Sequence, residues 1–144
     1  MTRARRPHPA ALAAALLIGL ALPALAEETP DPDGLAIGAR LFADHCAACH
    51  GTEARGDGPL APLLTVPTPD LRGLAARNDG TFPMRAVVHT IDGRTGRAAH
   101  GGPMPIWGAV FRETGGMQMG LYGSPLESRG RIMALTLWLE SIQD

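Results

Sequence analysis

The sequence predicts a small all-α domain in which a helix near each end of the chain crosses the other, with short helices and loops between them. One apolar stripe at helical spacing runs from Leu35 to Cys46, and a second runs from Ile132 to Ile142. Gly38 lies on the first stripe, although glycine in an exposed helix costs up to about 1 kcal/mol relative to alanine. Close approach of a second helix would offset that cost. We therefore expect the two terminal helices to cross at Gly38.

The strongest motif is a covalent haem attachment sequence, Cys46-Ala47-Ala48-Cys49-His50. On a helix, Cys46, Cys49 and His50 stand at i, i+3 and i+4 and share one face. Both sulfurs can then bond the vinyl groups on one porphyrin edge while the imidazole reaches the iron. A zinc site or a thioredoxin-like redox pair would also use two such cysteines, but the chain has no second pair. The motif predicts one covalently attached haem c with His50 as an iron ligand.

Residues 1–26 have the pattern of an export signal. The pattern begins with three basic residues, Arg3, Arg5 and Arg6. An apolar run from Ala10 to Leu22 follows, and small residues precede a cleavage site after Ala26. We expect a periplasmic protein with a mobile leader at 27–32 and one domain at 33–144. Cleavage would leave 10 arginines and 14 acidic residues, and this formal charge of −4 argues against binding nucleic acid or an anionic membrane.

The middle of the chain predicts short helices separated by loops. Residues 51–69 are rich in glycine and proline and require no regular structure. One short helix is expected from Asp70 to Asn78, and another begins at Pro83. Met84 starts an apolar stripe on that second helix and is expected in the core. His89 lies off the stripe, which makes it a poor candidate for a haem ligand.

Together these features resemble the class I c-type cytochromes, which are small all-helical electron carriers. That family pairs a Gly-xxx-Phe helix ending in the haem motif with a Leu-xx-aromatic C-terminal helix. The matching residues are Gly38, Phe42, Leu135 and Trp138. The resemblance covers Leu35 to Ile142 and implies a class I cytochrome c fold, His and Met axial ligands, and one-electron transfer. It also implies that a proline carbonyl accepts a hydrogen bond from the proximal imidazole; Pro62 matches that position, and Pro59 competes with it.

The methionine ligand that the resemblance implies is expected from Met104. Pro103 and Pro105 enclose this residue, and their fixed φ angles stiffen its loop. Met117 and Met119 lie in a glycine-rich stretch that would lose more conformational entropy in binding iron. The alternatives that stay open are Met119, Met117 and His100.

The haem is also expected to form part of the core, because the chain has only three Phe, two Trp and one Tyr. Burying a few hundred Å² of macrocycle at roughly 25 cal/mol per Å² contributes on the order of 10 kcal/mol. This is comparable with the ~5–15 kcal/mol net stability of a domain, so the chain without haem is expected to be largely unfolded. Trp107 is expected to line the haem edge and to donate its indole N–H to a propionate, with ordinary packing as the alternative.

These residues predict a periplasmic electron carrier with one haem and no enzymatic activity, since six-coordinate iron has no open position for a substrate. The expected partners are redox proteins that donate and accept the electron. We expect a monomer without stable membrane insertion after signal cleavage. Two alternatives stay open: a haem subunit docked to a dehydrogenase or terminal oxidase, and a ligand-sensing or peroxidatic haem protein with an open iron position.

Overall fold

The computed structural model describes residues 32–94, 104–114 and 120–144, and within these residues it contains helices and no strand. The α-helices are α1 (Pro32–His45), α2 (Ala47–His50), α3 (Met84–Asp92), α4 (Trp107–Thr114) and α5 (Gly120–Ser141). Two 3-10 turns lie between α2 and α3, namely η1 (Ala61–Leu63) and η2 (Ala76–Asn78). The all-α prediction is therefore confirmed. None of the helices in these ranges is long and apolar enough to cross a membrane.

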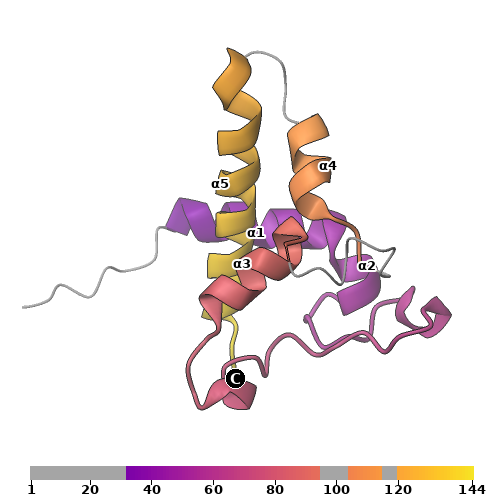
Figure 1. Ribbon diagram of the computed structural model, residues 1–144. Coiled ribbons are helices and arrows are strands. Elements are labelled where there is room, and N and C mark those ends of the chain that lie inside the picture. Colours follow the sequence, from indigo (N-terminus) through magenta and orange to yellow (C-terminus); the bar gives the residue numbers. More distant parts are fainter. Residues whose placement is uncertain (1–31, 95–103, 115–119) are drawn as a thin grey trace, which may run out of the picture.

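Helices α1 and α5 cross at Gly38, as the sequence predicts (Figure 1). A Cβ atom built on Gly38 would lie 2.1 Å from the carbonyl oxygen of Ala134 and 2.6 Å from the Cβ of Trp138. Next to the crossing, the rings of Phe42 and Trp138 pack with their centroids 4.5 Å apart. The helices can approach this closely only because residue 38 has no side chain.

The core is formed mainly by α1, α3 and α5. Among the residues that the structure describes, the buried apolar ones are Phe42, Ala54, Val87, Ile91, Phe111, Ile132, Leu135 and Leu139. The apolar stripes predicted for the two terminal helices and for α3 supply six of these eight residues. The prediction for Met84 was wrong, because Met84 is half-buried and does not pack against this core, whereas Phe82 does.

Helix α4 was not predicted, although Trp107 and Phe111 stand at i and i+4 and share a face. It packs alongside α5, and Phe111 is fully buried there. The hydroxyl of Ser128 on α5 donates a hydrogen bond of 3.1 Å to the carbonyl oxygen of Gly108 and joins the two helices. The apolar spacing from Ile106 to Phe111 is the sequence signal for this helix, and it is weak because it covers only two turns.

Two boundaries differ from the sequence predictions. Helix α5 begins at Gly120 and contains Pro125, whereas the sequence predicts a C-terminal helix from about Pro125 to Gln143. Residues 70–78 form turns that end in η2 and not one helix. The Asp70 carboxylate accepts a hydrogen bond of 2.8 Å from the Arg72 backbone N–H, and this local bond favours a turn over a helix.

The last residues of the chain fold back onto the segment 71–75. The side-chain oxygen of Gln143 accepts a hydrogen bond from the Ala75 N–H (2.9 Å), and its amide nitrogen donates to the Leu71 carbonyl oxygen (2.9 Å). Asp144 pairs with Arg72 at 2.8 Å and with Arg55 at 3.4 Å, and these arginines hold the pKa of its carboxyl below the usual range. The end of α5 is thereby joined to the loop between η1 and α3.

Candidate functional site

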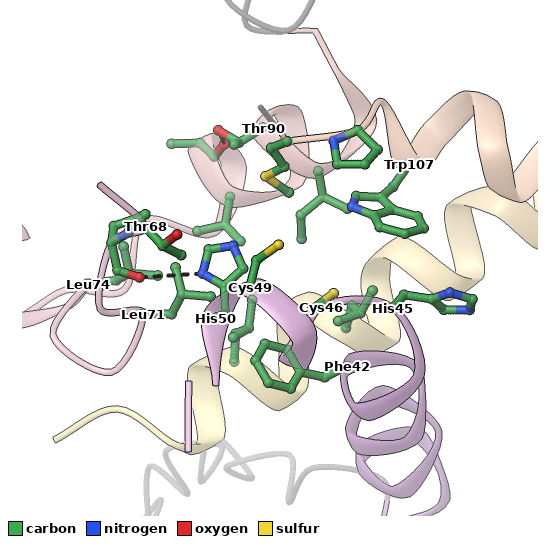
Figure 2. Close-up of a pocket in the computed structure, with 18 of the residues that line it drawn as sticks. Phe42, His45, Cys46, Cys49, His50, Thr68, Leu71, Leu74, Thr90 and Trp107 are labelled. Atoms are coloured by element: carbon green, nitrogen blue, oxygen red, sulfur yellow. Dashed lines mark hydrogen bonds between the residues drawn. The ribbon is translucent and has the colours of Figure 1, made fainter. Parts of the chain in front are cut away.

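Helices α1 and α2 place the two cysteines and the histidine of the motif on one face. The Cys46 N–H donates to the Phe42 carbonyl oxygen (2.8 Å), and the His50 N–H donates to the Cys46 carbonyl oxygen (2.9 Å), so helical turns continue through the motif. Figure 2 shows both sulfur atoms and the imidazole around the same cavity. The shared face that the spacing predicts is therefore present.

The cavity has a volume of about 370 Å³, within the range typical of small-molecule and cofactor sites. Its walls come from α1, α2, α3, α4, α5 and the loop 64–74, and they are overwhelmingly apolar. Five of the eight core residues line it, namely Phe42, Val87, Ile91, Leu135 and Leu139. The hydrophobic core of this domain is thus largely the wall of one cavity.

His50 is held as a neutral imidazole with one nitrogen available for a metal. Its Nδ1 atom lies 3.4 Å from the carbonyl oxygen of Pro69, which places the ring proton on Nδ1. Burial lowers the pKa of His50 below its usual value, while the Pro69 carbonyl acts in the opposite direction. Only neutral imidazole can bind iron, and a carbonyl partner on the second nitrogen fixes its orientation.

The prediction that Pro62 supplies this carbonyl was wrong, and Pro59 does not supply it either. After α2 the chain turns back against that helix. The Gly58 N–H donates to the Cys49 carbonyl oxygen, and the Leu60 N–H donates to the Ala48 carbonyl oxygen. Pro62 therefore lies in η1, against α2 and exposed. The chain returns to His50 only at Thr68 and Pro69, where Gly56 permits close contact.

Gly56 allows Thr68 and Pro69 to approach His50. Its N–H donates a hydrogen bond of 2.7 Å to the His50 carbonyl oxygen. A Cβ atom on Gly56 would lie 2.4 Å from the Thr68 carbonyl oxygen, and its φ of 81° is in the left-handed region that favours glycine. Gly56 thus brings the segment with Pro69 against the proximal histidine.

Both cysteines are free, and the environment of Cys46 favours a neutral thiol. Burial, with a smaller effect of Cys49, raises the pKa of Cys46 to about 12. Zinc sites and redox pairs need thiolates, which this environment disfavours. Among the described residues, no group of three or more His, Cys, Asp or Glu side chains could hold a metal ion. The pair fits uncharged thioether bonds better than either alternative.

Another wall of the cavity is formed by the segment that leads into α4. Met104 lines the cavity and packs against the core, and Trp107 lines it as well. Trp107 contacts the ring of His45, the residue before Cys46, with centroids 5.2 Å apart. His89 is absent from the lining, in agreement with the sequence prediction. The alternatives Met117, Met119 and His100 lie outside the described residues.

These residues fit a covalently bound haem. Two thiols stand on one helical face, a neutral imidazole stands beside them, and a thioether side chain belongs to another segment of the same apolar cavity. A haem c needs this set of groups and an apolar enclosure for its macrocycle. The hydroxyl of Thr68, which lines the cavity, is buried and has no hydrogen-bond partner among the described residues.

The family model for cytochrome c matches residues 35–118, which is more than half of the chain. The chain belongs to the cytochrome c family. The matched range contains the Cys46–His50 motif and Met104, and the helical fold with crossing terminal helices is that of a class I c-type cytochrome. A cytochrome c domain implies a covalently bound haem c, a role in electron transfer and redox partners.

One similar protein is the Cbb3-type cytochrome c oxidase subunit CcoP of Rubrivivax gelatinosus, which is 65% identical to this chain over 26 residues. The matched segment covers 18% of this chain and only 9% of the length of that subunit. No solved structure matches the chain at a significant level.

Proposed function

We propose that this cytochrome is a periplasmic one-electron carrier with a single haem c attached to Cys46 and Cys49, with His50 and Met104 as axial ligands. The observation that carries the proposal is the one apolar cavity that all four side chains line. With both axial positions taken by protein side chains, this chain offers no open iron position for a substrate. An electron carrier without enzymatic activity follows from that ligand set.

The side chains around the cavity would favour rapid, reversible electron transfer. Bound haem supplies one-electron chemistry at its iron. The Pro69 carbonyl fixes the His50 ring and raises its basicity as a ligand. A neutral thioether from Met104 raises the reduction potential relative to a second histidine. The apolar walls exclude water and disfavour the additional positive charge of the oxidised state, and this also raises the reduction potential.

Location and processing belong to the same proposal. Members of the cytochrome c family are typically exported, and residues 1–26 have the pattern of an export signal. We propose cleavage after Ala26, a leader at 27–32 and a cytochrome domain at 33–144. N-terminal sequencing of the protein isolated from periplasm should begin at Glu27. A mature protein that retains residues 1–26 would contradict this assignment.

The test of the ligand set is the optical spectrum of purified oxidised protein. Methionine–iron ligation gives a weak far-red charge-transfer band, which we expect in the wild type and not in Met104→Ala. Cys46→Ala and Cys49→Ala should each leave at most one thioether bond, and His50→Ala should not give normal holoprotein. Fully haem-loaded His50→Ala with a normal spectrum would refute the proposal. Binding of carbon monoxide by the reduced wild type would indicate an open iron position instead.

A second candidate function is that of a haem subunit docked to a terminal oxidase or dehydrogenase. The match to a segment of an oxidase subunit favours it, although that match covers a small part of either chain. Purification from native membranes under mild conditions separates the two functions. A free carrier is recovered in the periplasmic fraction, whereas a docked subunit is recovered with its complex.

A further inference from the structure

The Asp92 carboxylate is buried where the end of α3 meets the beginning of α4 (Figure 1). Its side chain is only 8% exposed, whereas that of Asp44, which pairs with Arg40 on the surface of α1, is 49% exposed. A buried charge is costly unless it is paired, so the groups around such a carboxylate are held in a restricted arrangement. The burial of Asp92 therefore calls for partners at this junction.

Asp92 has partners on both sides of the junction. Its carboxylate pairs with Arg94, which follows α3, and lies 3.8 Å from the guanidinium of Arg112 on α4. One carboxylate oxygen also lies against the first turn of α4, where a Cβ atom on Gly108 would be 1.9 Å from it. Negative charge is favourable at the N-terminal end of a helix. Asp92 thus joins the two helices through its charge as well as through its shape.

The beginning of α4 determines where Met104 lies. Only Pro105 and Ile106 separate this methionine from the first residue of α4, and the proline restricts the backbone between them. A Cβ atom on Gly93 would lie 2.5 Å from Ile106 Cγ2, so this short segment also contacts the end of α3. Met104 and Pro105 both line the haem cavity. A displacement of α4 from α3 would therefore move Met104 within that cavity.

We propose that Asp92 is a positioning residue that keeps Met104 bound to the iron; this inference rests on the ligand set assigned under the proposed function. Asp92 does not line the cavity, so it acts by joining α3 to the segment that carries the methionine. Loss of the axial bond requires Met104 to move away from the iron, and local opening between α3 and α4 permits that movement without global unfolding. The charge of Asp92 therefore determines how often the iron loses its methionine.

This role gives Asp92 control over the access of foreign ligands to the iron. When both axial positions are occupied, an added ligand can bind only after Met104 dissociates. At high ligand concentration, the rate of binding then reaches a limit that equals the rate of Met104 dissociation. Neutral imidazole is a suitable probe, because its approach to the protein does not change when a negative charge is removed.

The test is rapid mixing of oxidised holoprotein with increasing concentrations of imidazole. Asp92→Asn keeps the shape of the side chain and removes its charge, and we expect it to raise the limiting rate about tenfold at an unchanged covalent haem content. Asp44→Asn makes the same chemical change in an exposed ion pair, and its limiting rate should match that of the wild type. A role of Asp92 in global stability alone would lower the free energy of unfolding and leave the limiting rate unchanged.

Arg94→Gln combined with Arg112→Gln tests the same contact from the other side. This double variant removes both arginine partners and leaves the carboxylate, so we expect its limiting rate to rise as well. A wild-type limiting rate in Asp92→Asn would overturn the inference. If Asp92→Asn does not fold, a wild-type limiting rate in the double arginine variant would overturn it.

Failure of the proposed ligand set would give a different result. If Met104 did not bind the iron, the wild type and Met104→Ala would bind imidazole at the same rate. If Met104 binds the iron, the wild type should show the limiting rate and Met104→Ala should show none. The comparison of these two proteins therefore tests the ligand, and the Asp92 variants test how the ligand is held.

Discussion

Gln143 is one residue that joins two distant parts of the chain. Its side chain bonds Ala75 and Leu71 in the loop below His50, and it also donates to the Leu139 carbonyl oxygen at 2.7 Å. Leu71 and Leu74 in that loop line the cavity. Gln143→Ala would leave the half-buried backbone groups without partners. We expect a loss of about 1–3 kcal/mol in the free energy of unfolding of the holoprotein.

Guanidinium unfolding followed by circular dichroism measures this loss. Glu140→Ala is the matched control, because Glu140 is an exposed residue of the same helix and should change stability little. A Gln143→Ala protein as stable as Glu140→Ala would show that these hydrogen bonds do not hold the loop.

At the residue scale, the sequence predicts the local geometry of the site and not its long-range contacts. Cys46, Cys49 and His50 are correctly placed on one face because their spacing is a property of one helical turn. Pro69 was missed, because the chain leaves α2, passes through η1 and returns only where Gly56 allows contact with Thr68. Distance along the chain does not determine which proline of such a loop reaches the imidazole.

At the scale of helices, the crossing of α1 and α5 predicts opposite effects for two glycines. Gly38→Ala would place a Cβ atom 2.1 Å from the Ala134 carbonyl oxygen, so we expect a loss of about 1–3 kcal/mol. A Cβ atom on Gly130 of α5 would have no neighbour within 4 Å, so Gly130→Ala should stabilise the helix by up to about 1 kcal/mol. Thermal unfolding of both holoproteins tests the pair, and a raised melting temperature in Gly38→Ala would contradict the crossing.

The segment that carries Met104 is held at both ends by contacts between α3 and α4. A Cβ atom on Gly108 would lie 1.9 Å from an Asp92 carboxylate oxygen, and one on Gly93 would lie 2.5 Å from Ile106 Cγ2. Asp92 also pairs with Arg94. Because Cys46 lies outside α3 and α4, a change here should affect methionine ligation without affecting haem attachment.

Gly108→Ala should therefore separate α3 from α4, move Met104 and cost about 1–3 kcal/mol of stability. We expect a weaker far-red methionine–iron band at an unchanged covalent haem content. Gly130→Ala is the control for a helical glycine without close neighbours, and its band should match that of the wild type. A wild-type band and wild-type stability in Gly108→Ala would indicate that this contact does not position Met104.

The helices that could be predicted from sequence are those with a repeated apolar stripe. Leu135 and Leu139 on α5 and Val87 and Ile91 on α3 are buried as expected. Helix α4 has only two turns, and a stripe of that length is a weak signal. The turn at 70–78 depends on side-chain bonds to the backbone, such as that of Asp70, which compete with a helix of similar length.

At the scale of the whole molecule, the core and the site are one structure. In the described part of the chain, five of the eight core residues line the cavity, so most of this core can be filled only when the cavity is filled. The sequence indicated this dependence through its small number of aromatic residues. It explains why a domain of this composition can be stable with haem and should be largely unfolded without it.

The composition of the whole chain also determines which groups can replace Met104 at alkaline pH. A deprotonated amine binds iron more strongly than a thioether, and lysine is the usual source of one, but this chain contains no lysine. Arginine stays protonated at any accessible pH and cannot supply the nitrogen. The groups that could replace Met104 as a ligand are therefore hydroxide, the α-amine of the mature chain and neutral imidazoles.

The imidazoles differ in how readily they could reach the iron. His89 does not line the cavity, and His45 is held by ring contacts with Trp107 and Phe111 at 5.2 and 5.5 Å. His100 lies outside the described residues, four positions before Met104 in the same connection between α3 and α4. Local opening of one connection can exchange ligands without global unfolding, which favours His100.

We therefore expect methionine ligation to persist further into alkaline pH than in cytochromes that contain lysine, and we expect any low-spin nitrogen-ligated form to depend on His100. The measurement is a pH titration of the far-red band, together with the paramagnetic resonance spectrum, in wild type and in His100→Ala. His89→Ala is the matched control, since this imidazole does not line the cavity and its removal should change neither spectrum. The same nitrogen-ligated alkaline form in His100→Ala as in wild type would exclude His100. An intact band in Met104→Ala would show instead that another residue binds the iron, because the band reports the bond that the titration is meant to break.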